Sequence, residues 1–176
     1  MTDSPSPEST PTNGTPPLPW FVAHTRPRRE KKLAEYCERE GIVATVPCYR
    51  SVKKYRGKTA VFQKPLFPNY VFLRMLPEKR QTVYQSDHVA NVLEVVDQEL
   101  FEQQLGDILA ALETELEIFL APQVTAGSRV KIKSGPLRGV EGIVERRSGM
   151  TLVLLRLDFI SQAAAVKIDA NELELI

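Results

Sequence analysis

The sequence predicts an α+β domain followed by a small all-β barrel, and two observations carry this prediction. The first half alternates apolar, strand-like runs with segments of helical period, whereas the second half holds only short strands separated by turn residues. The change from mixed helix and strand patterns to short strands alone falls near residues 120–124. The expected organisation is a tail at 1–19, a mixed domain at 20–119, a linker at 120–124 and a barrel at 125–176.

Residues 1–19 hold six of the thirteen prolines among Ser, Thr, Asn and Gly, and their only clearly apolar residues are Met1 and Leu18. Such a segment buries too little to offset the entropy of ordering it, so we expect a disordered tail. A Pro-rich ligand for a partner domain is the alternative.

The first domain is expected to open with a strand at Trp20–His24. Pro27 suits a first helical position and Gly41 suits the residue just past a helix end, so a helix is predicted between them. Further predicted elements are a strand at 42–46, a long basic hairpin at 48–64, a strand at 69–73, a short helix at 78–86 and a strand at 89–96.

The clearest helix follows. Its apolar residues recur mostly at steps of three and four from Phe101 to Phe119, and acids cover its other face. Asp97 is the expected N-cap, and the helix must end before Pro122.

Short strands are then predicted at 129–133, 140–146, 151–157, 163–168 and 172–176. Gly135, Gly139 and Gly142 suit tight turns and close packing, where a Cβ would obstruct.

The charges nearly cancel, at 23 Lys plus Arg against 22 Asp plus Glu, but they are segregated. Residues 26–80 hold 15 basic and 5 acidic residues, a local +10, and residues 81–120 hold 9 acidic and no Lys or Arg. Such asymmetry indicates a polyanionic partner for the basic segment.

Composition also excludes several classes. No apolar run approaches a membrane span, and the N-terminus lacks the pattern of a secretory signal. Cys37 and Cys48 have no CxxC spacing, so we expect neither a disulfide scaffold nor a zinc site, and we expect a cytoplasmic protein without a cofactor. His24 and His88 are the only histidines, and no phosphate loop or nucleophile motif accompanies them, which argues against an enzyme.

Three motifs in this order resemble the NusG family: the strand at 20–23, the segment Pro65–Phe72 and the glycine-rich run from Gly127 to Gly142. The resemblance covers residues 20–176. It implies an N-terminal NGN domain, with an antiparallel sheet flanked by helices, and a C-terminal KOW barrel. Lys58–Val61 running into Leu66–Tyr70 is more similar to the specialised RfaH-like paralogues than to the housekeeping members.

The resemblance implies a monomeric factor that binds the clamp helices of the RNA polymerase β′ subunit and suppresses pausing and termination. The residues that match the polymerase-binding positions are Trp20, Phe67, Pro68, Tyr70, Phe72 and Thr82. A core role is the alternative for the aromatic residues.

DNA near the transcription bubble is the second implied partner. The residues expected to contact it are Arg26, Arg28, Arg29, Lys53, Lys54, Arg56 and Lys58, and a solvated basic face is the alternative. RfaH-like members read a base partly through positions that match His88 and Val89. This chain lacks their polar and basic pair, so sequence-specific loading is left open.

The KOW domain would recruit a ribosomal protein or Rho, and Phe159 and Ile160 are its candidate contact residues. A helical alternative for the C-terminal domain is left open, because Leu and Ala suit both states. Two other functions also stay open: a housekeeping NusG and a KOW protein that acts in translation.

Overall fold

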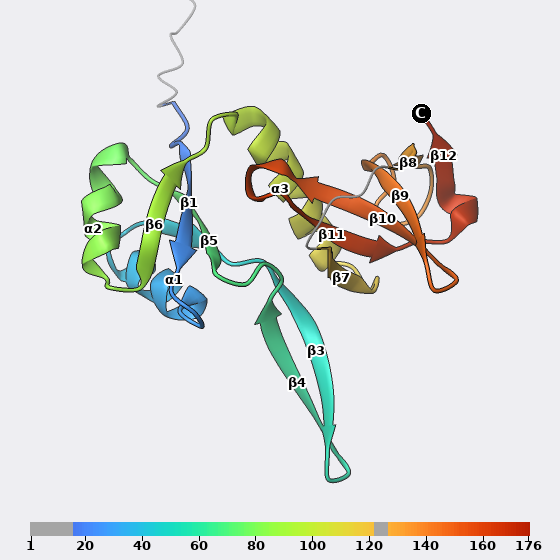
Figure 1. Cartoon of the computed structure of the whole chain (residues 1–176), viewed down its shortest axis with the longest axis horizontal. Coiled ribbons are helices and arrows are strands. Elements are labelled where there is room, and N and C mark those ends of the chain that lie inside the picture. The colour runs from blue at the N-terminus through green and yellow to red at the C-terminus, as the bar shows by residue number, and fades with distance from the viewer. Residues whose placement is uncertain (1–15, 122–126) are drawn as a thin grey trace, which may run out of the picture.

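The computed structural model describes residues 16–121 and 127–176, whose strands form a four-stranded, a six-stranded and a two-stranded antiparallel sheet. Figure 1 shows the two larger sheets joined by a long helix. The predicted tail lies outside the described residues except for its last four, and so does most of the predicted linker. The chain is mixed α/β at its N-terminal end and all-β at its C-terminal end, as the sequence predicts.

The N-terminal sheet has the strand order β2-β5-β1-β6. Its strands are β1 (Trp20–Thr25), β2 (Val43–Thr45), β5 (Tyr70–Arg74) and β6 (Val89–Glu94), and its helices are α1 (Glu30–Arg39), α2 (Arg80–Gln85) and α3 (Gln98–Leu112). A 3-10 turn at Pro77–Lys79 leads into α2.

Alternation along β1 divides this sheet into two apolar faces. Phe21 and Ala23 pack with residues of α1 and α2, and both are fully buried. Trp20 and Val22 point to the other face, which α3 covers with Phe101. A strand that is buried on both faces explains why this run is apolar without interruption.

The start of α1 differs from the prediction. Pro27 does not open the helix, because Arg28 has a φ of 60° and breaks the helical path directly after it. The helix begins at Glu30 instead. Gly41 does lie just past the helix end, with a φ of 72°, as predicted.

A two-stranded ribbon projects from the N-terminal sheet (Figure 1). It consists of β3 (Cys48–Tyr55) and β4 (Lys58–Pro65), joined by a tight turn at Arg56 and Gly57. This confirms the predicted hairpin.

Asp97 caps α3 as predicted, because its side chain accepts a hydrogen bond from the backbone N–H of Leu100 at 3.0 Å. The predicted continuation to Phe119 is wrong: α3 ends at Leu112. The Thr114 hydroxyl donates to the carbonyl of Ala111 and accepts from the N–H of Leu116, which turns the chain away from the helix axis.

The residues after this turn form β7 (Ile118–Ala121), which pairs antiparallel with β11. The C-terminal sheet therefore has the order β12-β8-β9-β10-β11-β7. Its other strands are β8 (Arg129–Ile132), β9 (Glu141–Arg147), β10 (Met150–Leu157), β11 (Gln162–Lys167) and β12 (Leu173–Leu175).

Gly142 shows why close packing in this sheet requires glycine. A Cβ at this position would lie 2.6 Å from Val153 Cγ1 and 2.7 Å from the Leu154 carbonyl oxygen. Gly139 serves its turn differently, since it has a φ of 92° that L side chains rarely adopt.

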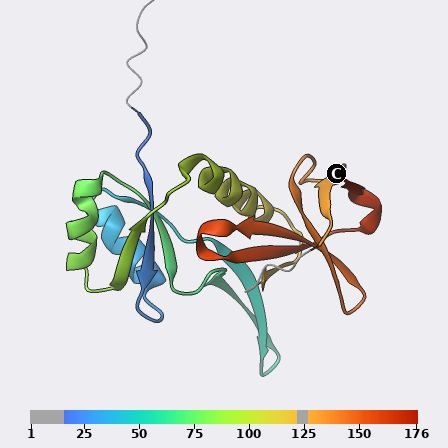
Figure 2. The ribbon, with the colours of Figure 1, turned by 45° about the horizontal axis from the view of Figure 1, so that its top comes forward.

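The C-terminal sheet lies against α3, as the turned view in Figure 2 shows. Apolar residues from both sheets and from α3 make one continuous buried cluster. Within the described ranges, no helix is long and apolar enough to cross a membrane.

Candidate functional site

The turn between β4 and β5 presents the most exposed part of the predicted polymerase-binding motif. Pro68 is exposed and Tyr70 is half-buried, with its ring centroid 5.3 Å from that of His24. Asn69 adopts a φ of 70°, so the chain reverses sharply between these two residues.

Glu30 at the start of α1 fixes this turn. Its Oε1 accepts a hydrogen bond from the N–H of Asn69 at 2.8 Å, and the N–H of Thr25 donates to the carbonyl of Asn69 at 2.8 Å. Glu30 is buried to 7% exposure. A buried carboxylate that accepts a backbone N–H holds the turn in one conformation and thereby sets the direction of Pro68 and Tyr70.

The other three aromatic residues of the motif are buried. Trp20 is 8% exposed, whereas Phe67 and Phe72 are essentially inaccessible. Phe101 of α3 packs against Trp20 and Phe72 at centroid distances of 5.6 and 5.5 Å. In this arrangement the three residues are part of the core, and their use as an interface stays a prediction.

Thr82 lies on α2, where its side chain is half-buried. Its carbonyl accepts a hydrogen bond from the hydroxyl of Tyr36 on α1 at 3.0 Å. The structure thus places Thr82 at the contact of the two short helices, on the face of the sheet opposite to α3.

The basic residues before α1 are exposed. Arg26 forms an ion pair with Asp87 at 3.2 Å, and both side chains are largely solvated, so this pair adds little to stability. Arg28 and Arg29 follow in the turn that precedes the helix.

His88 lies near these basic residues. Its pKa is lowered, first by burial and then by the charges of Arg29 and Lys32, with Arg26 adding to the effect and Asp87 opposing it. Arg26, Arg29 and Lys32, from the segment before α1 and its first turns, therefore lie near His88 at the start of β6, although they are distant from it in sequence.

The hairpin tip holds the second basic group. Lys53, Lys54, Arg56 and Lys58 are all exposed, so the tip presents four cations to solvent. The register divides them, because Lys53 and Lys58 share one face of the ribbon and Lys54 lies on the other.

Phe159 and Ile160 lie on the 3-10 turn Asp158–Ile160, between β10 and β11. Both are half-buried against the cluster that includes α3, and the ring of Phe159 meets that of Phe101 edge to face at 6.3 Å. In this arrangement the turn faces the rest of the chain.

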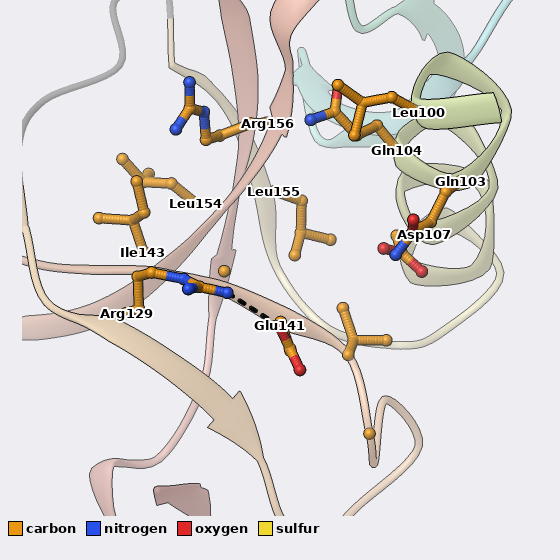
Figure 3. Close-up of a pocket in the computed structure, with 13 residues that line it drawn as sticks. Leu100, Gln103, Gln104, Asp107, Arg129, Glu141, Ile143, Leu154, Leu155 and Arg156 are labelled. Atoms are coloured by element: carbon orange, nitrogen blue, oxygen red, sulfur yellow. Dashed lines mark hydrogen bonds and ion pairs between the residues drawn. The ribbon is translucent and has the colours of Figure 1, made fainter. Parts of the chain in front are cut away.

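A cleft of about 380 Å³ separates α3 from β9 and β10 beside this contact, as Figure 3 shows. Asp107 enters it from α3, and Arg129 and Glu141 form an ion pair at 3.3 Å on the opposite wall. The pKa of Asp107 is raised, first by burial and then by the charge of Glu141.

Two structural roles escaped the sequence pattern. In the sequence Glu30 is one more acid in a charged helix, yet it binds the N–H of Asn69. Gln104 has the pattern of a solvated polar residue of α3, yet it forms hydrogen bonds with Asp158 across the contact between α3 and the C-terminal sheet. Neither residue carries a local signal, because both partners are distant in sequence. Within residues 16–121 and 127–176, no three His, Cys, Asp or Glu side chains gather as a metal site would need.

The fold is that of a two-part factor with an apolar turn and a basic surface on its N-terminal sheet. Residues 18–112, from β1 through the end of α3, match the family model NusG, described as transcription termination factor nusG. The match covers more than half of the chain, and the protein belongs to the NusG family. Members of this family act in transcription through RNA polymerase.

Proposed function

We propose that this protein is a transcription elongation and antitermination factor of the RfaH-like, specialised type. Its N-terminal domain, residues 20–119, binds the clamp helices of the RNA polymerase β′ subunit and suppresses pausing and termination. It acts in the cytoplasm as a monomer and makes or breaks no bond itself. The observation that carries the role in transcription is the family match over β1 to α3, together with the exposed turn that Glu30 fixes. The RfaH-like type rests on the sequence of Lys58–Val61 and Leu66–Tyr70.

The turn supplies the apolar contact. Pro68 and Tyr70 are the accessible members of the predicted set, and aromatic residues are enriched among binding hot spots. Tyr70 packs against the buried cluster that contains Trp20, Phe67 and Phe72. These three buried residues would contact the clamp helices themselves only after α3 and the C-terminal sheet rearrange.

The two basic groups supply the nucleic-acid contact. Arg26, Arg28 and Arg29 would face exposed single-stranded DNA, and the hairpin tip with Lys53, Lys54, Arg56 and Lys58 would approach upstream DNA. Such contacts neutralise phosphates and carry little sequence information. The closeness of Arg26 and Arg29 to His88 supports this assignment, because their charges, after burial, help to lower the pKa of His88.

The C-terminal KOW domain, residues 125–176, would recruit a ribosomal protein or Rho. Phe159 and Ile160 are the proposed contacts, and a partner that takes them competes with their packing on α3. The second candidate function is that of a housekeeping NusG, in which Rho is the partner; the departure at His88 and Val89 from the base-reading pair favours it.

Single-round transcription on a template with defined pause sites tests the proposal. Added protein should shorten the pauses, and a fragment of the β′ clamp helices should capture the protein and abolish the effect. Lengthened pauses, or capture by ribosomal subunits without polymerase, would contradict it. Increased Rho-dependent termination would favour the housekeeping function.

A further inference from the structure

The ribbon β3–β4 has two chemically different faces. In an antiparallel pair, residues directly opposite each other share a face, and so do alternate residues along each strand. The register therefore places four cross-strand pairs on one face: Tyr49 with Lys64, Ser51 with Phe62, Lys53 with Ala60 and Tyr55 with Lys58. We call this set of eight residues the aromatic face.

The aromatic face interleaves three rings with three lysines. Tyr55 is 72% exposed and Phe62 is 48% exposed, which is unusual for large aromatic side chains that stabilise no core. Successive pairs lie about 6.6 Å apart along the ribbon, from two residue rises. Rings and cations therefore recur from the tip to the base.

The base of the aromatic face opens into a pocket of about 420 Å³. Tyr49, Pro65 and Pro68 give it apolar walls, and Arg28, Lys31 and Lys64 give it positive charge. Lys31 donates from Nζ to the carbonyl of Gln63 at 2.6 Å, which ties α1 to the ribbon at the pocket. The carboxylate of Glu30 also lines the pocket, and its Oε1 is engaged by the N–H of Asn69.

The opposite face of the ribbon has no aromatic residue. Its pairs are Cys48 with Pro65, Arg50 with Gln63, Val52 with Val61 and Lys54 with Thr59. Val52 and Val61 are 57% and 48% exposed, so both faces present apolar area and cations to solvent. Only the aromatic face, however, adds flat rings on which a planar group can stack.

We infer that the aromatic face of the ribbon, together with the pocket at its base, binds single-stranded nucleic acid by stacking unpaired bases on the exposed rings of Tyr55 and Phe62. Tyr49 packs partly against the core and contributes the rest of its surface to the pocket. The interleaved lysines contact the phosphates. Rings alternating with cations match a chain of flat bases on a polyanionic backbone, and every base offers a face for stacking. In a duplex the faces of the bases are stacked on one another and are not accessible, so a duplex would contact only the lysines. An apolar protein partner would have to desolvate the lysines between the rings.

This inference deepens the proposed DNA contact of the hairpin, because it names the form of nucleic acid and adds residues that make the contact. It rests on the proposed function in one respect: the proposed function places the ribbon near the transcription bubble, where it would encounter a single strand. Unpaired DNA and RNA share the chemistry, and labelled oligothymidylate and oligouridylate distinguish them.

Fluorescence anisotropy of the full chain with these oligonucleotides, and with a duplex of equal length, tests the inference. The double variant Tyr55→Ala/Phe62→Ala should weaken single-strand affinity about tenfold or more, since base stacking contributes roughly 1–3 kcal/mol per base. The dependence of affinity on salt should be unchanged, because every cation is retained. Replacing both rings by Trp should restore binding.

The matched control is Val52→Ala/Val61→Ala, which removes exposed apolar area from the opposite face of the same ribbon. It should leave single-strand affinity unchanged, and neither double variant should alter duplex binding. Lys64→Gln should weaken binding of all single strands alike and reduce the salt slope by about 0.7. Thermal unfolding of each variant checks that the fold is retained.

Equal losses in the two double variants, or equal losses for single strand and duplex, would overturn the inference. So would a wild-type chain that captures polymerase but binds no single strand, and in that case the proposed function would stand. If the protein binds single strands through these rings but captures no polymerase, the inference holds and the proposed function fails.

Discussion

Gln104 on α3 binds Asp158 of the C-terminal part through two hydrogen bonds. Its side-chain nitrogen donates to Asp158 Oδ2 at 2.9 Å, and its Oε1 accepts from the backbone N–H of Asp158 at 2.9 Å. Both groups are partly buried, beside the contact of Phe101 with Phe159. This pair fixes the position of the turn at Asp158–Ile160 on α3, so the exposure of Phe159 and Ile160 depends on it.

Gln104→Ala should therefore weaken the contact between α3 and the turn Asp158–Ile160. A partly buried hydrogen bond contributes about 1 kcal/mol, and the variant leaves the N–H of Asp158 without its partner. Amide exchange at Asp158 should accelerate, and proteolysis of the Asp158–Ile160 turn should become faster. Gln103→Ala, on the same helix and lining the same cleft, is the control and should change neither rate. Equal protection from amide exchange and proteolysis in both variants would show that the contact of Phe101 with Phe159 alone holds the turn on α3.

Tyr70→Ala should weaken binding to the polymerase clamp by about 2 kcal/mol with the fold intact, since the side chain is half-buried at an exposed turn. Titration of a clamp-helix fragment measures the loss, and thermal unfolding monitors the fold. Leu76→Ala removes an apolar side chain that is 53% exposed just past the other end of β5, and it should leave binding unchanged. A large drop in stability without a specific binding loss would make Tyr70 a core residue.

Reversal of Lys53, Lys54, Arg56 and Lys58 to Glu should barely change folding, because all four are exposed. Affinity for the elongation complex should fall and its salt dependence should flatten, since fewer counterions are released. The loss should be equal on every template. An unchanged salt slope would leave the tip as a solvated basic face without a DNA contact.

Asp107→Asn should stabilise the protein at neutral pH. In the folded state the pKa of Asp107 is raised by burial and by Glu141, so its protonated form is favoured. Stability from this group is fully present below its ordinary pKa and declines as pH rises through the raised one. The advantage of the variant should thus vanish in acid. Thermal unfolding of the wild type and the variant across this pH range measures the difference.

Gly142→Ala should destabilise the C-terminal sheet by about 1–3 kcal/mol, because the new Cβ would collide with Val153 and with the carbonyl of Leu154. Gly106→Ala makes the same chemical change within α3, where nothing lies within 4 Å of the added atom. It should stabilise the helix by up to about 1 kcal/mol. Denaturant unfolding compares the two, and a mild effect at Gly142 would mean that β9 and β10 can move apart.

Local patterns predicted most of the elements, because their causes are local. The Asp97 cap and the reversal at Gly41 depend on residues within one helical turn. The error at the end of α3 has a non-local cause, whereas the error at the start of α1 comes from the positive φ of Arg28. The apolar period past Leu112 suits a helix as well as a strand, and the pairing of β7 with β11 decided between them. The candidate site divides in the same way: exposure of the tip cations followed from the hairpin, whereas burial of Trp20 and Phe72 depended on where α3 packs.

The pairing of β7 with β11 has a practical consequence for work on the C-terminal part alone. A fragment that begins at residue 125 lacks Ile118–Ala121, and the backbone donors and acceptors of Ala163–Val166 lose these partners. Ala163–Val166 carry only small, uncharged side chains, so of the residues on this strand only Lys167, at its end, opposes pairing with a second chain. Such a fragment should self-associate edge to edge at high concentration. Starting it before β7 should keep it monomeric.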